Sequence, residues 1–96
     1  MAVAETPSAV HIQNEMFGAD ARRRPIDAAV RAALEDLPGD WRVVVREVST
    51  VSPPWWRVRV DGGGLIVEVS FGPPEQNPEA LRRRLAEAVR ARTACG

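Results

Sequence analysis

The chain has 96 residues, 45% of them hydrophobic, and its 13 basic and 13 acidic side chains give a formal net charge of zero. A chain of this length forms one domain with a modest core, and the balanced charge excludes a general attraction to nucleic acids or anionic membranes. No apolar run approaches the roughly 18–20 residues that cross a bilayer, and the single cysteine, Cys95, cannot form an internal disulfide.

Every basic residue is an arginine, and lysine is absent. A bias toward Arg, Ala, Gly, Pro and Val together is typical of GC-rich genomes, so we expect a bacterial or phage protein. Arginine also recognises carboxylates and phosphates, so the bias is compatible with binding. The first residues lack the basic region and the apolar block of a signal peptide, which favours a cytoplasmic location.

Residues 1–20 show no sustained hydrophobic period. They contain the only histidine, His11, together with a few apolar side chains such as Ile12 and Phe17. We expect a flexible or loosely packed N-terminal arm over 1–20, followed by a single domain over 21–94.

A helix is predicted from Pro25 to about residue 37. Proline suits the first helical turn, and the apolar residues that follow recur at intervals of three and four. They are Ile26, Val30, Ala33, Leu34 and Leu37. The segment Pro38-Gly39 ends the helix, because proline cannot continue it and glycine can adopt the left-handed exit.

Three strands are predicted next, over 41–48, 55–60 and 65–71. Each alternates apolar and polar residues, and the last two flank the segment Asp61-Gly62-Gly63-Gly64. A two-residue turn at Gly62 and Gly63 would pair Val60 with Leu65 and Arg57 with Glu68. This register gives a hairpin with one buried and one exposed face.

The last helix is predicted over 78–92. Asn77 is a favourable N-cap, Pro78 fits the first helical position, and Glu79 lies in the positively polarised first turn. The resulting fold class is α+β: a helix, a three-stranded antiparallel meander and a helix, with both helices on one face of the sheet. Strands 41–48 and 65–71 are the predicted edges of this sheet.

The opposite face of such a sheet carries arginines around an aromatic ring and branched aliphatic side chains. Tryptophan and arginine are enriched at the energetic centres of protein interfaces, so this mixture favours partner binding. The candidate residues are Arg42, Val44, Arg46, Trp55, Arg57, Arg59, Ile66 and Glu68. The alternatives are a solvated face with Arg57–Glu68 as an ordinary cross-strand pair, or a Trp55 covered by Ile12 or Phe17 of the arm.

Nucleic-acid binding is a second hypothesis. Arginines and an aromatic ring on an open sheet can hold phosphates and stack bases. The order helix, three strands, helix resembles that of double-stranded-RNA-binding domains, which place a basic cluster at the start of the last helix. Arg82, Arg83 and Arg84 lie near the corresponding position, but Ser52-Pro53-Pro54 replaces the glycine-proline-histidine loop of that family.

Nothing in the sequence indicates catalysis, a metal or a cofactor. His11 and Cys95 lie near opposite ends of the chain, and no set of histidine, cysteine and carboxylate residues has metal-ligand spacing. The glycines at 62–64 join two strands and form a turn rather than a phosphate-binding loop. We therefore expect a non-enzymatic adaptor, inhibitor or regulatory subunit that binds another protein, or a second copy of itself as a dimer, through the sheet face or an edge strand.

Overall fold

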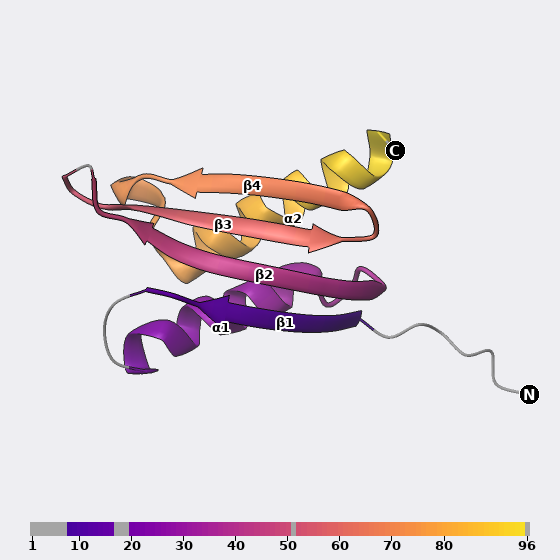
Figure 1. Cartoon of the computed structure of the whole chain (residues 1–96), viewed down its shortest axis with the longest axis horizontal. Coiled ribbons are helices and arrows are strands. Elements are labelled where there is room, and N and C mark those ends of the chain that lie inside the picture. Colours follow the sequence, from indigo (N-terminus) through magenta and orange to yellow (C-terminus); the bar gives the residue numbers. More distant parts are fainter. Residues whose placement is uncertain (1–7, 17–19, 51, 96) are drawn as a thin grey trace, which may run out of the picture.

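The computed structural model describes residues 8–16, 20–50 and 52–95, which form a four-stranded mixed sheet and two α-helices (Figure 1). The elements in chain order are β1 (Ser8–Asn14), α1 (Asp20–Leu34), β2 (Gly39–Val48), β3 (Trp55–Gly62), β4 (Leu65–Phe71), the short 3₁₀ helix η1 (Pro73–Glu75) and α2 (Pro78–Cys95). The strands lie in the order β1-β2-β3-β4; β1 is parallel to β2, and the other pairs are antiparallel. The predicted α+β class is confirmed, whereas the three-stranded meander is wrong.

The strand missing from the prediction is β1, which lies within the expected N-terminal arm. Ser8 pairs with Gly39 and Asn14 with Val45, so β1 covers the edge of β2 along seven residues. Neighbouring parallel strands need a crossover connection, and α1 provides it. Consequently β1 and β4 are the edges of the sheet, and the prediction that β2 is an edge strand is wrong.

Tertiary contacts hold β1 in place. The Asn14 side chain donates a 2.9 Å hydrogen bond to Asp27 of α1 and accepts a 3.0 Å bond from the backbone N–H of Met16. The N–H of Glu15 donates to the carbonyl of Val45 at 2.8 Å, which continues the pairing one residue beyond the strand. Met16 is buried, with 3% of its surface exposed. Asp27 and Val45 are distant from β1 in the sequence, so local periodicity alone could not specify these partners.

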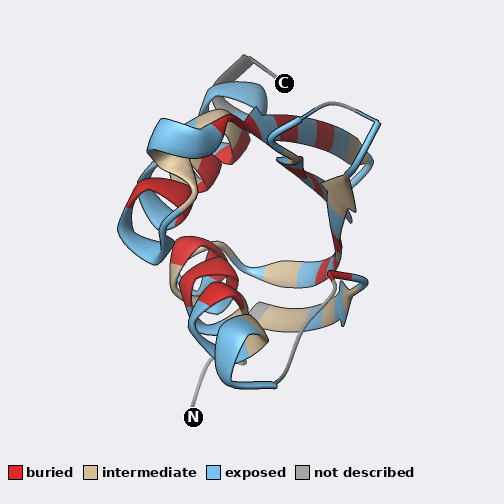
Figure 2. Ribbon diagram, turned by 90° about the vertical axis from the view of Figure 1, so that its left-hand side faces the viewer, coloured by how far each residue is buried: buried red, intermediate tan, exposed pale blue. Residues whose placement is uncertain are grey.

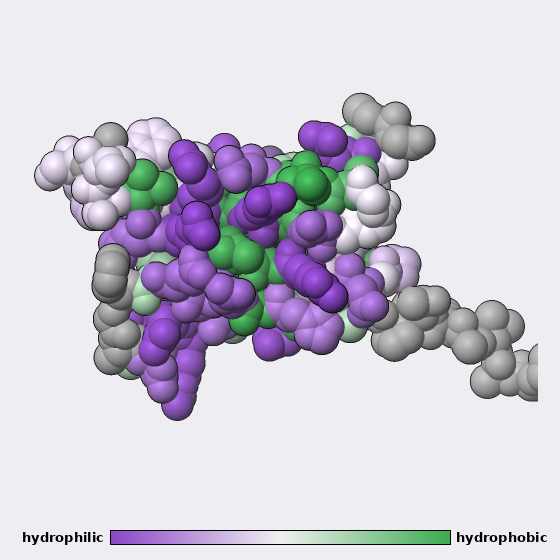
Figure 3. All heavy atoms as spheres, in the orientation of Figure 1, coloured by the Kyte–Doolittle hydropathy of each residue, from purple (hydrophilic) through white to green (hydrophobic). Residues whose placement is uncertain are grey.

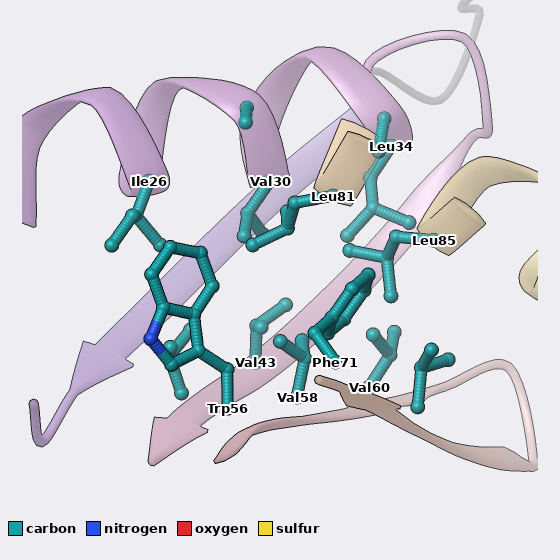
Figure 4. Close-up of a cluster of buried hydrophobic side chains, with 14 of the residues drawn as sticks. Ile26, Val30, Leu34, Val43, Trp56, Val58, Val60, Phe71, Leu81 and Leu85 are labelled. Carbon is teal, nitrogen blue, oxygen red and sulfur yellow. The ribbon is translucent and has the colours of Figure 1, made fainter. Parts of the chain in front are cut away.

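Both helices lie on the same side of the sheet, as the view along the strands shows (Figure 2). Every second residue of β2, β3 and β4 points toward them, and these residues are buried except for Gly39, Glu47 and Leu65, which are half-buried. In the close-up of the core, Ile26, Val30 and Leu34 of α1 meet Leu81 and Leu85 of α2 above the sheet (Figure 4). The other face of the sheet is left without a helical layer.

Helix α1 begins five residues earlier than predicted, at Asp20, so Pro25 lies inside it. The additional turn is supported by ion pairs that the local pattern did not indicate. Arg23 lies 2.8 Å from Asp20 across that turn, and Arg22 makes two hydrogen bonds of 3.1 and 3.2 Å to the carboxylate of Glu47 on β2. These contacts tie the residues before Pro25 to one another and to β2.

The β3–β4 hairpin forms with the predicted faces but with a different register. The turn residues are Gly63 and Gly64, whose φ values of 57° and 79° are those of the left-handed region. Moving the turn by one residue shifts the pairing by two, so Val60 pairs with Val67 and Trp56 with Phe71. Glu68 therefore lies opposite Arg59, and its contact with Arg57 is a diagonal ion pair of 3.8 Å.

Helix α2 begins at Pro78, as predicted, and Asn77 is its N-cap. The Asn77 Oδ1 accepts a 2.9 Å hydrogen bond from the backbone N–H of Ala80. The backbone of the helix continues to Cys95, beyond the predicted end, and the side chain of Cys95 lies outside the described part of the chain. Neither helix in the described ranges is long and apolar enough to cross a membrane.

Candidate interaction surface on the open sheet face

The eight candidate residues lie together on the sheet face opposite the helices, which we call the open face. Arg42, Val44 and Arg46 are alternate residues of β2, and Val44 alone among the eight is half-buried. Trp55, Arg57 and Arg59 are alternate residues of β3, while Ile66 and Glu68 occupy β4. Figure 3 views this face and shows apolar patches between hydrophilic side chains. The period of two residues in each strand was sufficient to predict this grouping.

Strand β1 adds residues that the sequence reasoning did not include. His11 pairs with Arg42 and Gln13 with Val44, and both side chains are exposed on the open face. Glu15, just beyond the strand, joins them through Arg46. The alternation of Val10 and Ile12 with His11 and Gln13, followed by a helix, was the signal for this strand. Ile12 is half-buried on the helical side of the sheet, and Phe17 lies outside the described residues.

Two large apolar side chains are exposed on the open face: Trp55, with 43% of its surface accessible, and Ile66, with 50%. Trp55 lies against the backbone of Gly72, where the Cβ of any other residue would come within 3.1 Å of the indole ring. Val48, the cross-strand partner of Trp55, lines the same shallow hollow of about 280 Å³ together with Arg57 and Ser70. The indole is thus supported by the backbone at Gly72 while nearly half of the residue remains accessible.

A second, smaller hollow of about 130 Å³ lies beside the first. Its lining is formed by Val44, Arg46, Arg57, Arg59 and Glu68, so three guanidinium groups surround one carboxylate. Arg57 lines both hollows. Among the described residues, Arg59 has no ion-pair or hydrogen-bond partner for its side chain, and the contact of Arg57 with Glu68 is long at 3.8 Å. The hollow therefore carries a local excess of positive charge in a neutral chain.

Glu15 and Arg46 form the shortest ion pair on the open face. The Arg46 Nε lies 2.8 Å from Glu15 Oε1. The hydrogen bond from Arg46, with a smaller effect of the hydrogen bond from Gln13, holds the pKa of the Glu15 carboxyl below its ordinary value. This pair joins β1 to β2 on the solvent side, where screening keeps its stabilising effect small.

Both edges of the sheet carry an arginine supplied by the helix that packs against them. The Arg31 Nη1 of α1 donates to the carbonyl of Val10 on β1 at 3.1 Å. The Arg84 Nη1 of α2 donates to the carbonyl of Ser70 on β4 at 3.2 Å. Each guanidinium group occupies a backbone acceptor that an added strand would need. We call Arg31 and Arg84 the edge caps.

The arginine triplet on α2 does not form a single cluster. Arg84 turns toward β4, where it also pairs with Glu75 at 2.7 Å and lies over the ring of Phe71 at 5.2 Å from its centre. Arg82 and Arg83 are exposed. The helix that carries them lies on the opposite side of the sheet from the open face (Figure 2), so these two groups of arginines cannot bind one ligand together.

Within the described ranges, no group of three or more histidine, cysteine, aspartate or glutamate side chains is placed to hold a metal ion. His11, exposed on β1, has no hydrogen-bond partner among these residues and is not paired with a potential nucleophile. The arrangement on the open face therefore offers charge and apolar contact rather than an acid–base pair.

Comparison of the sequence with models of known protein families gives no match, and neither does comparison with curated protein sequences.

Proposed function

We propose that this chain is a non-enzymatic protein-binding module, an adaptor, inhibitor or regulatory subunit, that binds its partner through the open face. The observation that carries the proposal is the position of Trp55 and Ile66. Both are large, apolar and about half exposed, and both lie on the one face that the helices leave uncovered. Covering such residues on binding is favourable because it removes apolar surface from water.

The composition of the open face supports the same proposal. Tryptophan and arginine are the side chains that contribute most to the energy of protein interfaces, and here they are neighbours on β3. Arg57 lies between Trp55 and Arg59 on the same face of the strand, so one contact patch combines an apolar anchor with directional hydrogen-bond donors.

The edge caps favour the open face over an edge strand as the binding surface. A partner strand added to β4 would have to displace Arg84 from the Ser70 carbonyl, and with it the ion pair to Glu75. A strand added to β1 would compete with Arg31 for the Val10 carbonyl. No comparable displacement is needed at Trp55.

The experiment is an affinity purification from the native host with the wild-type chain and with the double variant Trp55→Ala/Arg57→Ala. We expect the double variant to lose the captured partner and to keep the wild-type circular dichroism spectrum, because both side chains are exposed. Arg82→Ala/Arg83→Ala, on the helical side, is the matched control and should retain the partner. A double variant of the open face that still captures the partner would remove this surface from consideration.

A further inference from the structure

We infer that the partner presents a carboxylate side chain next to an apolar one: the carboxylate enters the hollow between Arg46, Arg57 and Arg59, and the apolar group covers Trp55. This inference rests on the proposed function and specifies the chemistry of the partner. It follows from the two neighbouring hollows of the open face, one cationic and one apolar.

The smaller hollow has the chemistry of a carboxylate site. Arg59 has no partner among the described residues, and Arg57 shares Glu68 only at 3.8 Å, so donor groups of both remain available. A guanidinium group binds a carboxylate through two parallel hydrogen bonds, which are stronger than hydrogen bonds between neutral groups. Val44 forms part of the same lining and adds an apolar wall beside these donors.

The apolar hollow lies next to the cationic hollow along β3. Trp55 and Arg57 are two positions apart on this strand, which corresponds to about 6.6 Å. An extended partner segment also repeats its side chains on one face every two residues, at about the same distance. An acidic residue and an aliphatic or aromatic residue two positions apart would therefore reach both hollows at once.

A single carboxylate fits this face better than a polymer of phosphates. Glu15, Asp61 and Glu68 are interspersed with the arginines, and Glu68 lines the cationic hollow itself. A nucleic-acid backbone carries a negative charge at every nucleotide and would meet these carboxylates, whereas one side chain enters between them. A second copy of the chain fits less well, because in a two-fold dimer the excess guanidinium groups of one open face would face those of the other.

The test is a selection of ligands for the whole chain from a random peptide library displayed on phage, with counter-selection on Trp55→Ala/Arg59→Glu. We expect the enriched peptides to share an aspartate or glutamate two positions from an aliphatic or aromatic residue. In a synthetic peptide of this kind, replacing the acid by its amide should weaken binding about tenfold or more, because a hydrogen bond to a charged group is lost. Arg59→Glu should weaken binding of the acidic peptide and favour a lysine-substituted one, while the matched charge reversal Arg82→Glu should change neither.

The outcomes separate the inference from the function on which it rests. Enriched peptides that depend on Trp55 but contain no acid, or that bind equally as amides, would overturn the carboxylate and leave the open face as a binding surface. Failure to enrich any peptide whose binding depends on either Trp55 or Arg59 would contradict both the carboxylate and the open face as a binding surface. Two further measurements test other occupants of the open face. A dimer in sedimentation equilibrium that dissociates in Arg59→Glu would assign the face to a second copy of the chain. A gel shift of duplex RNA that is lost in Arg59→Glu would assign it to RNA. Either result would overturn the inference.

Discussion

Replacing Gly62 by alanine tests the register of the hairpin and the packing of its buried face. Gly62 is the last residue of β3 and is buried. An added Cβ would lie 2.6 Å from the carbonyl oxygen of Asp40 and 2.6 Å from Cε3 of the Trp41 indole. Neither neighbour is the free end of a flexible side chain, so the strand or the indole has to move.

The size of the effect follows from these contacts. Adding a methyl group to a packed site costs about 1–3 kcal/mol. Displacing the indole also strains its 3.0 Å hydrogen bond to the carbonyl of Leu37, which contributes about 1 kcal/mol. We therefore expect Gly62→Ala to lower the free energy of unfolding by about 2–4 kcal/mol.

A double-mutant cycle with Trp41→Phe identifies the cause. The smaller ring lacks the atom that the new methyl group meets, so part of the cost of Gly62→Ala should disappear in this background. We expect a coupling of about 1–2 kcal/mol between the two substitutions, measured by urea denaturation followed by circular dichroism. Gly63→Ala is the matched control: its φ of 57° makes alanine unfavourable, but no atom of another residue lies within 4 Å of the new methyl group, so it should be additive with Trp41→Phe. If Gly62→Ala and Trp41→Phe are additive within about 0.5 kcal/mol, the predicted contact between the new methyl group and the Trp41 indole is refuted.

The remaining predictions concern the core, the ion pair that joins β1 to the sheet and the edge of β4. Leu85 is fully buried, so Leu85→Ala should lower the free energy of unfolding, measured by urea denaturation, by about 2–4 kcal/mol. The exposed control Arg82→Ala should leave it nearly unchanged. A negligible effect of Leu85→Ala would contradict the observed core. The lowered pKa of Glu15 means that its contribution to stability is present above the ordinary glutamate pKa and is lost as the pH falls through the folded value; Arg46→Ala should move the Glu15 pKa upward in an NMR titration of its carboxyl carbon, and an unchanged pKa would exclude Arg46 as the cause. Arg84→Ala should free the edge of β4 and raise the average mass in sedimentation equilibrium above that of Arg82→Ala at the same concentration; equal masses would show that the cap does not limit association.

The parts of the fold that follow from local periodicity could be predicted from the sequence. Helix α2 has an asparagine cap, a proline in its first position and an apolar stripe, and each of these signals acts within one turn. The inward and outward faces of β3 and β4 follow from alternation alone. The faces survived the error in the register because a one-residue shift of the turn changes the pairing by two, which preserves the alternation.

The parts that could not be predicted depend on contacts between distant residues. The glycines at 62–64 allow more than one two-residue turn. In the observed register Gly62 lies against the ring of Trp41, a contact between residues that are distant in the sequence. The stability of strand β1 depends on pairing with β2, which follows it only after the whole of α1, as well as on the bond from Asn14 to Asp27. A period of two over a few residues does not specify these partners.

The arginines illustrate why the binding surface is less predictable than the fold. Residues of the same type occur in β2, β3, α1 and α2, and the sequence does not distinguish a guanidinium group held by its neighbours from one that is available. In the structure, Arg31 and Arg84 reach backbone carbonyls at the sheet edges, and Arg22 holds Glu47. These contacts engage arginines that face the helical side or the edges of the sheet. Arg59, without a partner among the described residues, lies next to Arg57 on the face without helices, so part of the charge that structural contacts leave available lies on the same strand as the exposed ring of Trp55.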